Sequence, residues 1–228
     1  MIQQKTFLYI GCGPKRKDKT TRAFNTDAWR ELRLDIDARV DPDIMGSMTN
    51  MSTVADASVD AIFSSHNIEH LYPHEVGLAL NEFRRVLRPD GFLVVTCPDL
   101  QAVCRLVAED KLLEPAYTAP AGPIAPLDIL YGHRSPMARG NLYMAHRCGF
   151  TQRVLDGTLR VEGGFASVAS MKRDHPFSTC GPSLASPHAT KWRCAPWLPS
   201  TFRGNGVGTN GVRSSYVAWI ATSLSSSR

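Results

Sequence analysis

Two short groups of residues have the types and spacing that could do chemistry. The first is the pair Gly11 and Gly13, which follows an apolar run at residues 6–10. Asp35 comes 22 residues after Gly13. A strand that breaks into Gly-x-Gly is typical of a tight turn beside a nucleotide, because a side chain there would hold the backbone away from the ligand. A carboxylate that ends the next strand accepts hydrogen bonds from both hydroxyls of a ribose. The spacing therefore predicts a nucleotide-type cofactor.

The second group is His66-x-x-Glu69-His70, which follows an apolar run at residues 59–65. His-x-x-Glu-His is the signature of inverted zinc proteases. Here it follows a predicted buried strand, and no later acid stands out as a further ligand, so we predict no metal site. We expect Glu69 and His70 to cap the start of the next helix. Because imidazole titrates near neutral pH, His66 is the predicted catalytic base where an acceptor must lose a proton.

Strand and helix signals alternate along the chain and must position these groups. Parallel strands buried on both faces have near-continuous apolar runs, as the segments here do. The sequence therefore predicts an α/β fold, a Rossmann-like doubly wound, mostly parallel sheet with flanking helices. We expect strands at residues 6–10, 31–36, 43–46, 59–65 and 92–97, and helices at residues 74–88 and 100–109, with Asp99 as the N-cap of the second helix and Pro89-Asp90-Gly91 ending the first.

Other segments are less regular. Residues 14–30 should carry the first crossover, but Pro14 and a basic run start it poorly, so we expect a short or irregular connection. Residues 115–140 are rich in Pro and Gly and predict a long loop that covers a ligand. A helix at residues 147–158 and a strand within residues 161–171 would follow.

The composition changes at residue 174. Residues 1–173 hold 21 basic and 20 acidic side chains, whereas residues 174–228 hold five basic ones and a single acid, Asp174. The pI near 9.0 therefore comes from the tail and does not indicate a nucleic-acid-binding face. With three of the four tryptophans, ten serines and no clear period, residues 174–228 predict an irregular tail, either disordered or out of frame, after a domain at residues 1–173.

Four segments together resemble class I S-adenosylmethionine-dependent methyltransferases of the type 11 methyltransferase domain family. They are Leu-Tyr-Ile-Gly-Cys-Gly, Leu-Asp-Ile-Asp, Ser-Val-Asp-Ala-Ile-Phe-Ser-Ser-His-Asn-Ile-Glu-His-Leu and Glu-Phe-Arg-Arg-Val-Leu-Arg-Pro-Asp-Gly-Phe-Leu-Val-Val. The resemblance spans about residues 6–110, with a fainter similarity to residue 171. It implies S-adenosylmethionine as the cofactor and transfer of its methyl group to a small-molecule acceptor.

The resemblance also implies roles for individual positions. Gly11 and Gly13 would pass beneath the methionine and ribose of the cofactor, and Asp35 would bind the ribose hydroxyls. The adenine would lie against Ile36, Met48 and Thr49, and the methyl group would face Ser65 and His66. His70, His133 and His146 are the further candidates on the acceptor side.

This chain departs from the family at Tyr9. Relatives commonly carry an acid two residues before the first glycine, where it helps to hold the methionine amino group. The departure leaves open a non-catalytic or inactivated S-adenosylmethionine-binding protein. A nicotinamide-dependent oxidoreductase shares the fold, but it would require a third glycine at a helix start to bind its pyrophosphate, and here Pro14 and Lys15 follow Gly13.

Six cysteines without Cys-x-x-Cys or zinc spacing indicate reduced thiols. Neither a signal segment nor an apolar run long enough for a bilayer is evident in the sequence. We therefore expect a cytoplasmic protein without a membrane or nucleic-acid partner. The sequence predicts neither the methyl acceptor nor the oligomeric state.

Overall fold

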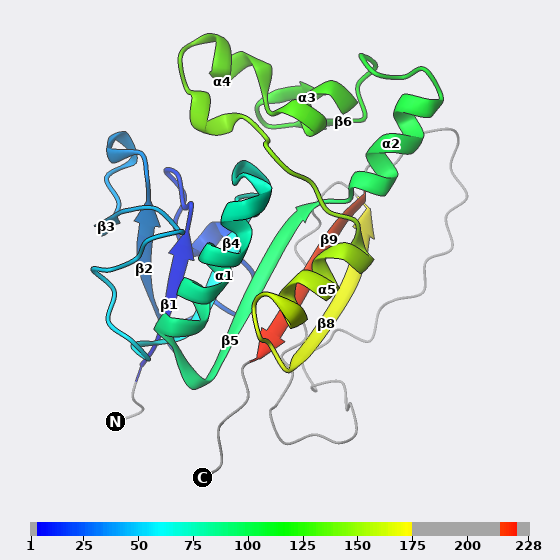
Figure 1. The fold of residues 1–228 in the computed structure, drawn as a ribbon. Helices are drawn as coiled ribbons and strands as arrows, with labels where there is room; N and C mark the ends of the chain where they lie inside the picture. Colours follow the sequence, from blue (N-terminus) through cyan, green and yellow to red (C-terminus); the bar gives the residue numbers. More distant parts are fainter. Residues whose placement is uncertain (1–3, 175–214, 223–228) are drawn as a thin grey trace.

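A seven-stranded sheet in the order β3-β2-β1-β4-β5-β9-β8 forms the centre of the molecule (Figure 1). The computed structural model describes residues 4–174 and 215–222. The strands are β1 (Lys5–Ile10), β2 (Trp29–Asp35), β3 (Ile44–Met45), β4 (Val59–Ser65), β5 (Leu87–Pro98), β8 (Ser167–Asp174) and β9 (Ser215–Thr222). The strands from β3 to β5 pair in parallel, and β9 is antiparallel to both neighbours. The predicted α/β class is confirmed.

The two faces of the sheet have different coverings. Alternate side chains of a strand point to opposite faces, so Leu8 and Ile10 of β1 join a large core with α1 (Pro73–Val86) and α5 (Gln152–Val161). Both helices lie on that one face (Figure 1). Phe7 and Tyr9 point to the other face. There the predicted first crossover is irregular, as expected: within residues 14–28 its regular structure is a single 3₁₀ turn at Lys17–Lys19.

An aromatic side chain covers the part of the sheet on which a crossover helix would otherwise pack. Phe24 is buried and stacks on Phe7 with ring centroids 4.4 Å apart. It also makes edge contacts with Trp29 and Phe63 and stacks on Phe92. Aromatic rings bury large apolar areas, so a loop with one phenylalanine can close this part of the sheet.

The boundary between α1 and β5 differs from the prediction. The helix ends at Val86 and β5 begins at Leu87, so the Arg-Pro-Asp-Gly segment lies within the strand and does not end the helix. Pairing with β4 jumps from Leu87 to Phe92, and the four residues between them form the irregularity. The glycine at position 91 lies against the backbone of Arg88, where a Cβ would crowd the Arg88 carbonyl oxygen.

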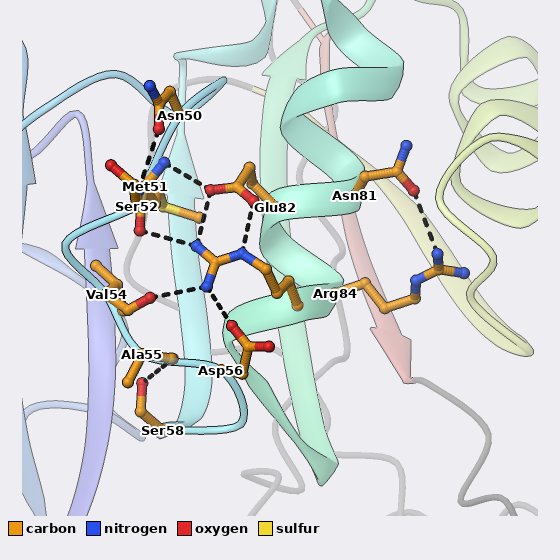
Figure 2. A network of polar contacts seen from close by, with 11 residues as sticks. Asn50, Met51, Ser52, Val54, Ala55, Asp56, Ser58, Asn81, Glu82 and Arg84 are labelled. Carbon is orange, nitrogen blue, oxygen red and sulfur yellow. Dashed lines mark hydrogen bonds and ion pairs between the residues drawn. The ribbon is translucent and has the colours of Figure 1, made fainter.

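Arg85 joins α1 to the loop that precedes β4. Its guanidinium donates to the carbonyl oxygens of Val54 at 2.9 Å and Met51 at 2.8 Å, and to Glu82 and Asp56 at 2.6 Å. Glu82 in turn accepts from the Met51 backbone N–H at 2.6 Å. Figure 2 shows this network, which fixes the path between β3 and β4.

Residues 115–140 are not the long loop that their Pro and Gly content predicts. They form a hairpin, β6 (Tyr117–Ala119) and β7 (Gly122–Ile124), followed by α3 (Pro126–Tyr131) and α4 (Arg134–Ala138). Short elements of this kind can form because they share a small core with α2 (Leu100–Ala108): Val103, Leu106, Ala116, Ile124 and Ile129. We call residues 110–150 the cap segment; its helices lie above the carboxyl end of β5 (Figure 1).

Side-chain caps begin several of the helices. Asp99 accepts a hydrogen bond from the Gln101 backbone N–H at 3.2 Å and caps α2 as predicted. Thr151 caps α5 in the same way, so that helix begins at Gln152 and not at residue 147. The late strand predicted within residues 161–171 is β8, which begins at Ser167. Of the helices in the described residues, none has the length and apolarity to cross a bilayer.

The prediction of an irregular tail at residues 174–228 is wrong for its strand β9. The sequence Ser-Tyr-Val-Ala-Trp-Ile-Ala-Thr at residues 215–222 has the β-branched and aromatic residues that favour strands. It pairs with β5 on one side and β8 on the other, so the sheet does not lack its late strands. Residues 175–214 and 223–228, on which the rest of the tail hypothesis depends, lie outside the described residues.

Candidate functional site

A cavity of about 500 Å³ opens at the carboxyl ends of β1, β2 and β4, and we call it the edge cavity. This is the edge at which open α/β sheets bind ligands, and the volume suits a small-molecule cofactor. The eight residues predicted to bind the cofactor all line it, although they come from four separate segments: Gly11, Gly13, Asp35, Ile36, Met48, Thr49, Ser65 and His66.

The two glycines are required for different reasons. Both have left-handed backbones, with φ of +59° at Gly11 and +54° at Gly13. A Cβ on Gly11 would overlap the Asn67 side-chain amide, which donates to the Ile10 carbonyl oxygen at 2.8 Å. A Cβ on Gly13 would meet no atom within 4 Å. Close approach of a protein side chain, and not of a ligand alone, therefore explains the first glycine.

Asp35 lies at the floor of the edge cavity with 9% of its surface exposed. Its carboxylate accepts hydrogen bonds from the backbone N–H groups of Gly13 at 2.7 Å and Asp37 at 2.9 Å, one on each oxygen. The Cys12 thiol lies 3.9 Å away, and burial raises its pKa to about 11, so it remains protonated. Since a carboxylate oxygen accepts more than one hydrogen bond, Asp35 can also bind ribose hydroxyls.

Tyr9, the position at which the family commonly has an acid, points away from the edge cavity. It is buried in the aromatic cluster and meets Phe63 edge-on, with centroids 5.3 Å apart. Burial raises the pKa of its phenol, so it brings no charge to the site. At this position the chain therefore has an uncharged side chain that points away from the edge cavity, where the family commonly has an acid.

His66 occupies a strained position at the end of β4. Its φ of +57° is left-handed, which is uncommon for a residue other than glycine and often marks functional sites. The backbone N–H donates to the Thr96 carbonyl oxygen at 2.9 Å. The side chain is 32% exposed, lines the edge cavity, and places Nδ1 3.3 Å from Oε1 of Glu69. The neighbouring Ser65 hydroxyl is 2.8 Å from the hydroxyl of Thr96.

Glu69 does not cap the following helix as predicted. Glu75 has that role, accepting from the Tyr72 backbone N–H at 2.8 Å. Glu69 lies instead in a 3₁₀ turn (Ile68–His70) and is 1% exposed. Burial acts to raise its pKa, but the hydrogen bond and charge of His66, and the charges of two further histidines, hold the pKa below its usual value.

The structure brings two of the three acceptor-side histidines together. His70 and His146 have ring centroids 4.8 Å apart. His70 lines the edge cavity, and His146 lines a second cavity of about 190 Å³ between Glu69, β5, α2 and the cap segment. Burial lowers the pKa of His146. His133 precedes α4 and lines neither cavity.

Several lining residues gave no signal in the sequence. Asn67 comes from the loop after β4, and four others come from the end of the cap segment: Asn141, Tyr143, Met144 and Arg147. They reach the edge cavity because the cap segment folds back, with the Arg147 backbone N–H donating to the Glu69 carbonyl oxygen at 2.8 Å. This contact joins positions 78 residues apart, which no local pattern predicts.

Comparison with known proteins agrees with this arrangement. Residues 8–95 match the sequence model of a family described as "Methyltransferase domain". This part of the chain is a methyltransferase domain. The match confirms the predicted family, and with it S-adenosylmethionine as the cofactor. No curated protein matches the chain in a sequence search.

Solved structures resemble the methyltransferase domain and the strands beyond it. A SAM-dependent methyltransferase from Archaeoglobus fulgidus is 12% identical with a TM-score of 0.56, over 97% of this chain and 87% of that one. One from Methanosarcina mazei is 14% identical with a TM-score of 0.53, over 99% and 95%. The 1,6-didemethyltoxoflavin-N1-methyltransferase of Burkholderia thailandensis, solved with bound 1,6-didemethyltoxoflavin and S-adenosylhomocysteine, is 16% identical with a TM-score of 0.51, over 98% and 72%. These likenesses show the fold.

Proposed function

We propose that this chain transfers a methyl group from S-adenosylmethionine to a small-molecule acceptor. The observation that carries the proposal is the convergence of all eight predicted cofactor residues on the edge cavity. A second cavity lies beyond Glu69 and the histidines, under the cap segment, where an acceptor would be shielded from water. We also propose a cytoplasmic location, as expected from the sequence.

The residues of the edge cavity fit the cofactor. Asp35 would bind the ribose hydroxyls, since each of its oxygens already takes one backbone N–H and accepts another donor. Ile36, with 48% of its surface exposed, offers an apolar wall for the adenine, and Met48 and Thr49 line the same cavity. The bound cofactor supplies an already activated methyl group, so alignment and exclusion of water are the main tasks of the protein.

His66 is the proposed base where the acceptor must lose a proton. Glu69 faces its Nδ1 atom, and this carboxylate would stabilise the imidazolium that forms when Nε2 takes the proton. The left-handed backbone turns the side chain toward the edge cavity directly after β4. We expect His66→Gln to slow methyl transfer about a hundredfold, with a much smaller loss of affinity for S-adenosylhomocysteine.

A non-catalytic cofactor-binding protein is the second candidate, favoured by the buried, uncharged Tyr9. A nicotinamide-dependent oxidoreductase is not favoured, because residues 14–28 lack the α-helix whose N-terminus would hold a pyrophosphate. The two remaining hypotheses, a methyltransferase and a non-catalytic binding protein, share the cofactor and differ in whether a methyl group is transferred.

The test is calorimetric titration of S-adenosylhomocysteine into the full chain and into Asp35→Asn. Loss of charged hydrogen bonds to the ribose should weaken binding about tenfold to a hundredfold. Asp27→Asn, at an exposed acid outside the cavity, should bind as the parent does. Absence of binding by the folded parent contradicts the proposal. Binding without transfer of labelled methyl groups to any member of a diverse acceptor panel would favour the second candidate.

A further inference from the structure

Glu69, His70 and His146 form a cluster in which only Glu69 has a role in the proposed reaction. Their ligand atoms all lie within 4.8 Å of one another. The first two are neighbours in the turn after β4, and the third arrives from the cap segment. Backbone hydrogen bonds hold them there, since the N–H groups of Arg147 and Cys148 both donate to the Glu69 carbonyl oxygen, at 2.8 and 3.2 Å.

Glu69 lacks the partners that a buried carboxylate needs. Within the part of the chain that the structure describes, Oε2 of Glu69 accepts no hydrogen bond, although only 1% of the residue is exposed. Its one ion pair there is with Nδ1 of His66, at 3.3 Å. An ionised carboxylate taken out of water is costly unless donors or a metal ion compensate it, so a buried carboxylate with one oxygen that no donor reaches points to a missing cation.

The two histidines are oriented as metal ligands are. Nδ1 of His70 is 3.0 Å from the Ala145 carbonyl oxygen, and Nδ1 of His146 is 2.7 Å from the Ile129 carbonyl oxygen. A carbonyl oxygen only accepts, so each Nδ1 carries a proton, and in the neutral imidazole Nε2 carries a lone pair. Histidines that ligate metals show this pattern, with the remote nitrogen bonded to a carbonyl or carboxylate that fixes the ring.

We propose that Glu69, His70 and His146 bind a divalent transition-metal ion, with Zn²⁺ the best match to two imidazoles and one carboxylate. Three protein ligands with an open position are typical of reactive zinc sites, whereas Mg²⁺ and Ca²⁺ prefer oxygen ligands alone. Tetrahedral ligands with bonds of about 2.1 Å lie about 3.4 Å apart, so closing the cluster requires side-chain movements of about 1 Å. In addition to its proposed role as base, His66 would hold Glu69 in position through the contact of its Nδ1 with Oε1.

The place of the cluster suggests what the ion would bind. His70 lines the edge cavity, while Glu69 and His146 line the second cavity, so the ion would lie in the wall between them. Resting on the proposed function, an acceptor oxygen or nitrogen in the second cavity could take the open position. A bound metal lowers the pKa of such a group and so prepares it to receive a methyl group.

The test uses the full chain after treatment with a chelator, without cofactor or acceptor. Zn²⁺ is titrated calorimetrically, and Co²⁺ is followed by its visible absorption. We expect one ion per chain, and a loss of affinity of at least tenfold in Glu69→Gln and His146→Ala. His133→Ala and His74→Ala, at histidines outside the cluster, should bind as the parent does.

Thermal unfolding with and without Zn²⁺ shows whether each variant is folded, since a ligand of the native state raises the Tm. If His146→Ala fails to fold, the nearly isosteric Glu69→Gln decides the question. The proposal is overturned if the folded parent does not bind Zn²⁺ saturably, or if the control variants lose as much affinity as the cluster variants. Because no cofactor is present, these results do not depend on whether the chain binds S-adenosylhomocysteine or transfers methyl groups.

Discussion

The floor of the edge cavity and the cap segment, which forms part of the wall of that cavity, are held in different ways. The floor of the cavity consists of turns that leave paired strands, so the register of β1 with β2 and β4 sets the positions of Gly11 and Asp35. The cap segment has its own small core, and it joins the rest of the molecule through backbone hydrogen bonds near Glu69 and through Phe150, which belongs to the large core. The proposed cofactor side is thus part of the frame, by which we mean strands β1 to β5 and the turns that leave them. The cap segment, on the proposed acceptor side, is an attachment that can vary without changing the frame.

Gly11→Ala should have the largest effect, because it changes a turn of the frame itself. The new methyl group overlaps the Asn67 amide, and the left-handed backbone disfavours alanine. We expect a loss of about 2–4 kcal/mol in the free energy of unfolding and no measurable binding of S-adenosylhomocysteine. Denaturant unfolding and calorimetry would measure both, and a variant with the parent's stability would contradict the account of Asn67.

Arg85→Ala breaks the frame at a distance from the site. It removes hydrogen bonds to the carbonyl oxygens of Val54 and Met51 and leaves Glu82 without its guanidinium. We expect a loss of about 2 kcal/mol in the free energy of unfolding, discounted for the partly exposed ion pairs. Arg84→Ala is the matched control, since Arg84 directly precedes Arg85 in α1 and its described hydrogen bond, to Asn81, is exposed. Equal losses in the two variants would refute the role of the network.

Asp128→Ala tests the cap segment as a separate attachment. Burial would raise the pKa of this carboxyl, but hydrogen bonds from Arg134 and from the Ala125 backbone lower the pKa to about 2. The folded value lies below the unfolded one, so the group stabilises the fold above about pH 4, and this contribution is lost as the pH falls toward 2.

At pH 7 we expect Asp128→Ala to unfold with about 1–2 kcal/mol less free energy than the parent, and the difference should shrink at pH 3. Hydrogen exchange should quicken in α3 and the β6–β7 hairpin, while S-adenosylhomocysteine binds as before. A large loss of cofactor affinity would show that the two regions are not separate.

Gly157→Ala should have the smallest effect and the opposite sign. Gly157 lies inside α5, its Cβ would meet no atom within 4 Å, and alanine is the better helix former. We expect a gain of about 0.5–1 kcal/mol in the free energy of unfolding, without any change in cofactor affinity. It is also the glycine-to-alanine control for Gly11, and a loss of stability would show that α5 is packed more tightly than the structure indicates.

Much of the frame could be predicted because its signals are local. The apolar runs that form β1 and β4, the Gly-x-Gly turn and Asp35 each depend on neighbours within a few residues, as does the Asp99 cap. Parallel strands must end at one edge of the sheet, so the carboxyl-end residues were expected together, and they line one cavity. The family resemblance covered the same part of the chain.

The remaining errors come from long-range packing. The Pro and Gly content of residues 115–140 suggested a loop, but a shared core with α2 stabilises short elements there. In the tail, the run at residues 215–222 is too short to stand out among serines, and it becomes a strand only because β5 and β8 leave a place between them.

The sequence by itself determined which segments form the parallel strands, the Gly-x-Gly turn after the first of them, and the family of residues 8–95. These features follow from periodicity, backbone preference and local spacing. Only the tertiary structure decided that Tyr9 points away from the cavity, that Asn67 lies against Gly11, and that His146 joins Glu69 and His70. The physical reason is that contacts between distant segments depend on how layers pack, and no periodicity along the chain records them.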